Sequence, residues 1–136
     1  MREDRRSNCP ISTGLEVLGD RWTLLIVRDL MFAGKRHYRE FLQSEEGIST
    51  NVLADRLETL VARGLVTKSG DQTHKQKARY SLTEKGIALL PVILALSGWS
   101  QKYFPETRLP GARALLEGGD ALRRKLEARL RKEHLG

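Results

Sequence analysis

Three small polar residues, Ser49, Thr50 and Asn51, stand together at the head of the clearest apolar stripe in the sequence. Their hydroxyl and amide groups can form hydrogen bonds with the edges of DNA bases or with phosphate oxygens, and an asparagine amide can pair with adenine through two hydrogen bonds. Asp55 follows one turn later, and its carboxylate could accept from the amino group of a cytosine. These residue types therefore favour recognition of a nucleic acid.

Cationic side chains surround this polar turn, and their positions suit contact with a phosphate backbone. They are Lys35, Arg36 and Arg39 ahead of the turn, Arg56 beside the apolar stripe, and His74, Lys75, Lys77 and Arg79 farther along the chain. Contacts with phosphates orient a protein on DNA without reading its sequence. We therefore expect the cations to position the protein, and Ser49, Thr50 and Asn51 to select the bases.

The composition agrees with a partner that carries negative charge. The chain has 136 residues, with 24 Lys and Arg against 17 Asp and Glu, and its formal net charge is +7. This length suits one main domain, and the positive balance attracts a polyanion. The apolar runs are too short to cross a bilayer and no signal peptide opens the chain, so we expect a cytoplasmic protein without membrane contact.

The periodicity of apolar residues predicts a mainly α fold with one small β-hairpin. Helices are expected over 9–19, 21–32, 38–43, 49–63 and 84–103, with strands at 65–68 and 78–82. Ser49 caps the fourth helix, and Pro91 is expected to bend the last one. This is the element order of a winged helix-turn-helix, in which the basic loop between the strands is the wing.

Two of these helices, 21–32 and 84–103, are apolar on more than one face. Either a partner subunit covers the second face or the helix lies in the centre of the core. We predict a DNA-binding and dimerisation domain over 1–104 and a basic helical extension over 105–136. That extension could serve as a dimerisation arm through Leu122, Leu126 and Leu130, as a DNA-flanking arm through Arg123, Arg124 and Lys125, or as a solvated tail.

Several short patterns, taken in order, resemble the HxlR family of bacterial winged-helix regulators. They are Cys9-Pro10, Gly19-Asp20-Arg21-Trp22, His37-Tyr38-Arg39-Glu40-Phe41, Ile48-Ser49 with Leu53 and Arg56-Leu57, Gly64-Leu65-Val66, Tyr80-Ser81-Leu82-Thr83, Leu90-Pro91 and Trp99. The resemblance implies a homodimer whose N-terminal and closing helices form the interface, bound to a two-fold operator. The sequence departs from the usual family pattern at two places. Arg79, rather than an acidic residue, precedes Tyr80, and residues 76–78 contain no proline. The resemblance implies nothing about residues 105–136.

The single cysteine, Cys9, leaves two interpretations open. Some relatives respond to oxidants or electrophiles through an N-terminal cysteine, whereas a lone thiol can also be inert or simply buried. Trp22 and Trp99 could similarly line an effector pocket or pack in the core. The three histidines, His37, His74 and His134, lack metal-ligand spacing and are expected at the surface or on phosphates, so we predict neither a metal nor a cofactor.

No Cys-His arrangement, paired carboxylates or phosphate-binding glycine loop occurs at a workable spacing, so an enzyme is not expected. The sequence predicts a homodimeric transcriptional regulator, more specifically a repressor, which binds double-stranded DNA and responds to an oxidant or a small molecule. The alternative is a winged helix used only for contacts with other proteins.

Overall fold

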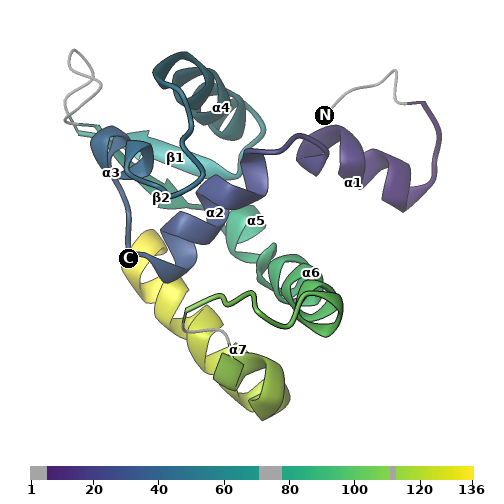
Figure 1. Cartoon of the computed structure of the whole chain (residues 1–136). Helices are drawn as coiled ribbons and strands as arrows, with labels where there is room; N and C mark the ends of the chain where they lie inside the picture. Colours follow the sequence, from purple (N-terminus) through teal and green to yellow (C-terminus); the bar gives the residue numbers. More distant parts are fainter. Residues whose placement is uncertain (1–5, 71–77, 111–112) are drawn as a thin grey trace.

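The computed structural model describes residues 6–70, 78–110 and 113–136, and it is mostly helical with one antiparallel β-hairpin (Figure 1). In chain order the elements are α1 (Pro10–Leu18), α2 (Thr23–Phe32), α3 (Tyr38–Leu42), α4 (Thr50–Ala62), β1 (Val66–Ser69), β2 (Arg79–Leu82), α5 (Glu84–Ile87), α6 (Leu90–Tyr103) and α7 (Arg113–Leu135). The predicted fold class is confirmed. In the described parts of the chain, no helix is long and apolar enough to span a membrane.

Helix α2 lies at the centre of the fold, between the hairpin and the closing helices (Figure 1). Its residues Ile26, Val27, Leu30 and Met31 are almost completely buried within the chain itself. Residues on both of its apolar faces are therefore covered without a partner, so the structure favours the interpretation of α2 as a central core helix. The start of α2 is fixed by Asp20, whose carboxylate accepts hydrogen bonds from the N–H groups of Trp22 and Thr23.

The single bent helix predicted over 84–103 is wrong, because this segment forms two helices, α5 and α6. Proline has no N–H to donate, and its ring clashes with the carbonyl four residues earlier, which for Pro91 is that of Ile87. Helix α5 ends at Ile87, and Pro91 lies in the first turn of α6, where its fixed φ is compatible with a helix. The break allows α6 to leave the hairpin in a new direction.

Helix α7 begins beyond the predicted boundary at residue 104, yet its second half folds back onto the main body (Figure 1). Gly119, with φ +71°, interrupts the helix. Leu126 and Leu130 are buried, at 7% and 0% exposure, and belong to the same core as α2. These two leucines are therefore covered by their own chain, which does not favour the interpretation of the extension as a dimerisation arm through them.

Candidate nucleic-acid interface

Helix α4 presents the polar turn identified in the sequence. Ser49 is its N-cap, and its Oγ accepts a hydrogen bond from the N–H of Val52 at 3.3 Å. Thr50 and Asn51 follow in the first turn with exposed side chains. The opposite face of α4 is buried through Leu53, Leu57 and Leu60. The core thus fixes the helix while its polar first turn remains accessible to a ligand.

Helix α3 supports this turn from below and is itself firmly anchored. The hydroxyl of Tyr38 donates to the carbonyl of Thr50 at 2.9 Å. At the start of α3, Glu40 Oε1 accepts from the N–H groups of Arg36 and His37, each at 2.9 Å. The hydrogen bond from the Arg36 N–H is the main reason that the pKa of Glu40 is lowered. This pattern is a capping box, which we did not assign from the sequence although Glu40 stands at its third helical position.

Arg56, predicted to reach the DNA backbone, is engaged in ion pairs within the protein. Its Nε lies 3.0 Å from Asp20 Oδ2, and its Nη1 lies 2.5 Å from Asp55 Oδ2. Burial opposes the ionisation of Asp20, but hydrogen bonds from Thr23, the Trp22 N–H and Arg56 lower its pKa overall. Arg56 therefore joins α4 to the start of α2, and its positive charge partly balances the negative charge of Asp55.

The three cations near the start of α3 have different surroundings. Arg36 points to the hairpin, where its Nε donates to the Tyr80 carbonyl at 2.7 Å and its Nη2 to Ser81 Oγ at 2.5 Å. Arg39 is exposed, and no hydrogen bond or ion pair is found for it within the described residues. Arg39 is consequently better placed than Arg36 to contact a phosphate.

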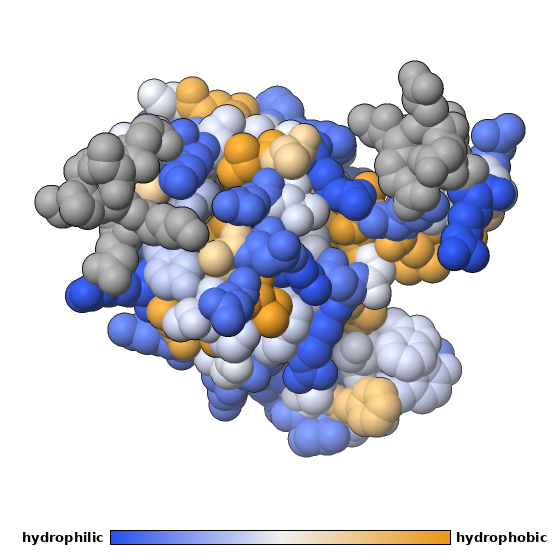
Figure 2. Space-filling view, turned by 90° about the horizontal axis from the view of Figure 1, so that it is seen from above, coloured by the Kyte–Doolittle hydropathy of each residue, from blue (hydrophilic) through white to orange (hydrophobic). Residues whose placement is uncertain are grey.

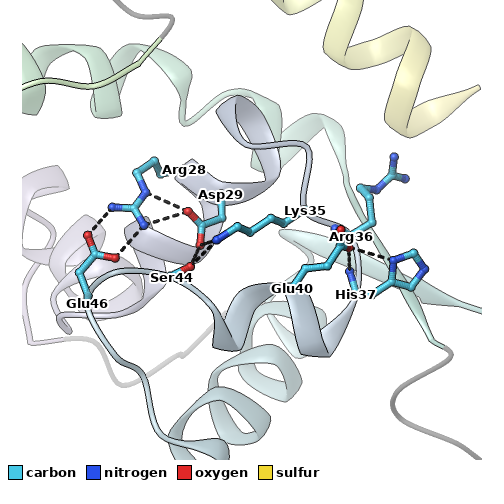
Figure 3. Close-up of polar contacts among 8 residues, drawn as sticks. All are labelled: Arg28, Asp29, Lys35, Arg36, His37, Glu40, Ser44 and Glu46. Carbon is cyan, nitrogen blue, oxygen red and sulfur yellow. Dashed lines mark hydrogen bonds and ion pairs between the residues drawn. The ribbon is translucent and has the colours of Figure 1, made fainter.

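Lys35 belongs to a polar network that joins α2 to the loop before α4 (Figure 3). Its Nζ donates to Ser44 Oγ at 2.8 Å, and the Ser44 hydroxyl donates in turn to Asp29, which is only 5% exposed. Arg28 bridges Asp29 and Glu46, and both of its terminal nitrogens reach the carboxylate of Glu46, at 2.7 and 2.9 Å. The hydrogen bonds from Arg28 lower the pKa of Glu46 to about 2.

This network fixes the loop that leads into α4, and the periodicity of the sequence does not predict it. An available signal was Asp29 itself, which follows Arg28 in a helix whose other residues are mostly apolar. A buried carboxylate needs partners, so its presence predicts cations and donors nearby.

The hairpin provides the base of the wing. Strands β1 and β2 pair antiparallel, with Val66 opposite Leu82 and Ser69 opposite Arg79. Arg79 is exposed at the end of β2 nearest the wing loop. His74, Lys75 and Lys77, which we also expect to contact DNA, lie outside the described residues.

Seen from the side of α4, the face to the left of α1 is mainly hydrophilic (Figure 2). Hydrophobic colour gathers toward α1, which extends away from the body and has no buried residue (Figures 1 and 2). The polar first turn of α4 thus lies on a polar face, whereas the apolar surface of α1 lies to one side of it.

A second apolar surface follows α6. Val92, Leu96, Trp99 and Tyr103 are spaced four, three and four residues apart, so they form one stripe. They are 41%, 52%, 59% and 59% exposed. On α1, Ile11 and Leu15 form a shorter stripe that is 72% and 61% exposed. Large exposed apolar side chains in this arrangement are typical of a protein interface.

Cys9 is exposed at the start of α1 and lies in the same shallow depression as Ile11 and Leu15. A separate cavity of about 210 Å³ lies between α2, α6 and residues 107–109. Neither Trp22 nor Trp99 lines this cavity, so it does not support the interpretation of the two tryptophans as part of an effector pocket. Trp99 instead packs against Tyr103 on the surface, with 5.5 Å between ring centroids.

A capped helix braced by a preceding helix and followed by a hairpin defines a winged helix-turn-helix protein. The family described as HxlR-like helix-turn-helix matches residues 17–108. The chain belongs to this family, and it is a transcriptional regulator with a helix-turn-helix domain.

Curated relatives carry the same description. The regulator YdeP of Bacillus subtilis is 32% identical over 100 residues, which cover 74% of this chain and 77% of YdeP. The Mycobacterium tuberculosis regulator MT3179 is 35% identical over 100 residues, but the match spans only 62% of that protein. Both are named as uncharacterized HTH-type transcriptional regulators.

Solved structures extend the similarity to three dimensions. The crystal structure of PA1607 matches with a TM-score of 0.66 and 37% identity, covering 76% of this chain and 72% of PA1607. The redox regulator HypR in its oxidized form matches with a TM-score of 0.57 and 32% identity, covering 69% of this chain and 96% of HypR.

Proposed function

We propose that the protein is a repressor that acts in the cytoplasm as a homodimer, with one α4 helix of each copy in a major groove of a palindromic operator. The observation that carries the proposal is the exposed turn of Ser49, Thr50 and Asn51, fixed at the head of α4 by α3 and flanked by Arg39. A dimer places two such helices about one helical turn of DNA apart, roughly 34–36 Å. A protein seated in this way would exclude RNA polymerase from the same DNA.

The second copy would pack on the exposed stripes of α1 and α6. An isologous interface needs a surface that is complementary to itself, and apolar stripes on helices provide one. This assignment also agrees with the interface that the family resemblance implies. It leaves the polar face of α4 available to DNA.

The decisive variant for sequence readout is Asn51→Ala. We expect it to weaken binding to a selected operator by about 10- to 100-fold, because a bidentate contact to a base contributes about 1–3 kcal/mol to discrimination. Binding to unrelated duplex DNA and the dependence of affinity on salt should not change. The operator would first be selected from fragments of the source genome. Fluorescence anisotropy with this operator and with a scrambled duplex would then measure specific and non-specific affinity.

The matched comparison is Arg39→Ala, which removes an expected phosphate contact. It should weaken binding to operator and scrambled DNA equally, and reduce the slope of log affinity against log salt by about one. If wild type fails to bind duplex DNA at low salt, or binds all sequences equally, specific readout is excluded. The protein-interaction alternative would then remain.

We further propose that Cys9 transmits an oxidant signal to the operator complex. The thiol is exposed beside the α1 stripe, and HypR, a structural relative, is named a redox regulator. Since the chain contains one cysteine, a disulfide at Cys9 must join two chains or one chain and a small thiol. Either product would change the surface on which the second copy is proposed to pack.

Mild oxidation with diamide is therefore expected to change the operator affinity of wild type by at least about fivefold, within the usual range of coupling between sites. The affinity of Cys9→Ser should be unaffected, and a reductant should restore wild type. Intact mass would identify the adduct or the cross-linked dimer. Equal responses of wild type and Cys9→Ser would refute the sensor role.

A further inference from the structure

The outer edge of strand β2 is closed by two separate parts of the chain. In the antiparallel pair with β1, the N–H groups of Tyr80 and Leu82 are directed away from the partner strand. The Tyr80 N–H donates to the carbonyl of Arg36 at 2.8 Å. The Leu82 N–H donates to Nδ1 of His134, in the last turn of α7, at 3.0 Å. A side chain more than fifty residues away along the chain therefore takes the place of a third strand.

The imidazole of His134 also forms a hydrogen bond with the backbone of Leu30 in α2. A neutral imidazole has one acceptor and one donor nitrogen, and here Nδ1 accepts from Leu82 while Nε2–H is left to donate to the Leu30 carbonyl. The ring thus joins the wing strand to the central helix. It was expected at the surface or on a phosphate, and that prediction is wrong.

Neighbouring contacts hold the last turns of α7 against the base of the hairpin. Leu130 is completely buried, and Arg131 Nε lies 2.6 Å from Glu84 Oε1 on α5. The matched family region ends at residue 108, so these contacts come from a segment beyond it. Arg36 and Arg79, two of the cations that the sequence predicts on DNA, lie close enough to His134 to act on its charge.

We propose that His134 is a positioning residue for DNA binding, which acts by holding β2, and through it Arg79, against α2. The assignment rests on the proposed DNA-binding function. It does not place His134 in contact with DNA. Its effect should instead reach the DNA through the orientation of the hairpin.

Two substitutions separate the acceptor nitrogen of His134 from the bulk of its ring. His134→Phe keeps an aromatic ring but has no acceptor for the Leu82 N–H. His134→Asn loses bulk but carries an amide oxygen close to the position of Nδ1. If the hydrogen bond positions the hairpin, Phe should weaken operator affinity by about threefold to tenfold, in line with loss of one hydrogen bond, and Asn should remain near wild type.

Amide hydrogen exchange at Leu82, followed by NMR, provides a readout that requires no DNA. Exchange should accelerate in His134→Phe and remain slow in wild type and in His134→Asn. A stability control is Ile93→Val in the core of α6, which shortens a buried side chain without touching the hairpin. Its operator affinity, measured well below the melting temperature, should equal that of wild type.

Protonation gives an independent check, because a charged imidazole cannot accept from Leu82. Burial, followed by the positive charge of Arg36 and, least of all, that of Arg79, lowers the pKa of His134 from 6.5 to about 4, and Glu133 and the hydrogen bond with the Leu30 backbone only partly oppose this shift. Between these two values the unfolded chain binds a proton that the folded chain does not. The stability of wild type should therefore fall as pH is lowered from about 6.5 toward 4, relative to His134→Asn, and show no further relative change below 4.

The outcomes distinguish the positioning role from the DNA-binding function. If His134→Phe binds operator like wild type while His134→Asn binds weakly, the ring only fills space and the proposal is overturned. Equal operator affinities for all three proteins would also overturn it. If wild type binds no DNA, the proposed function fails, and exchange at Leu82 still decides whether His134 holds the strand.

Discussion

Replacing Leu96 by glutamate is expected to convert the proposed homodimer into monomers and to weaken operator binding by about 100-fold or more. Leu96 lies in the middle of the exposed α6 stripe, so the new carboxylate would be buried without a partner at the proposed interface. The monomer fold should tolerate the change, because the side chain is half exposed within a single chain. Each subunit would then bind one half-site, without the gain in affinity that a linked second half-site provides.

Sedimentation equilibrium and anisotropy with a full operator would measure the two effects together. A matched control is Ala128→Glu, which adds the same charge at an exposed position of α7 outside the stripe. It should leave both oligomeric state and affinity unchanged. A Leu96→Glu protein that remains dimeric would show that the second copy packs elsewhere.

Replacing Asp29 by asparagine is expected to lower the free energy of unfolding by about 2–4 kcal/mol. Removing one partner of a buried ion pair typically costs about 3–5 kcal/mol, and the lower range applies because Arg28 keeps its two hydrogen bonds to Glu46. Lys35 and Ser44 would lose a charged acceptor as well. Because these contacts hold the loop before α4, operator affinity should fall even at temperatures where the variant is folded.

Urea denaturation would give the free energy, with an unchanged m-value showing that the two-state transition persists. The control is Glu45→Gln, an exposed acidic neighbour of Glu46 in the same loop, which should change stability by less than about 0.5 kcal/mol. If Asp29→Asn is as stable as Glu45→Gln, the network does not contribute to the fold as its burial implies.

The fold was predictable because local signals agreed with the tertiary structure. The Ser49 cap and the leucine stripe located α4 within a residue or two, and the short strands on either side of a polar loop located the hairpin. Helix caps and the spacing of apolar residues depend on residues that are close in sequence, so both can be recognised without the tertiary structure. Pro91 was recognised as a disruption, but whether a proline bends a helix or ends it depends on packing on both sides.

The contacts of the candidate site were harder to predict, because they join residues far apart in the chain. Composition identified Arg36 and Arg56 as cations, yet only the fold shows that Arg56 pairs with Asp20 and that Arg36 holds the hairpin. A charged residue expected on DNA can satisfy a backbone carbonyl or a carboxylate instead, and spacing does not distinguish these outcomes. Arg39 and the turn of Ser49, Thr50 and Asn51 remain exposed, and their contact with DNA is a proposal.

The closed edge of β2 also has a consequence for the behaviour of the protein at high concentration. An unpaired strand edge offers N–H and carbonyl groups to another molecule and can initiate intermolecular sheets. Here Arg36 and His134 occupy the outward N–H groups of Tyr80 and Leu82. The last turn of α7 thereby covers the β2 edge of a small two-stranded sheet, and a protein without the His134 contact should form β-rich aggregates at lower concentration than wild type.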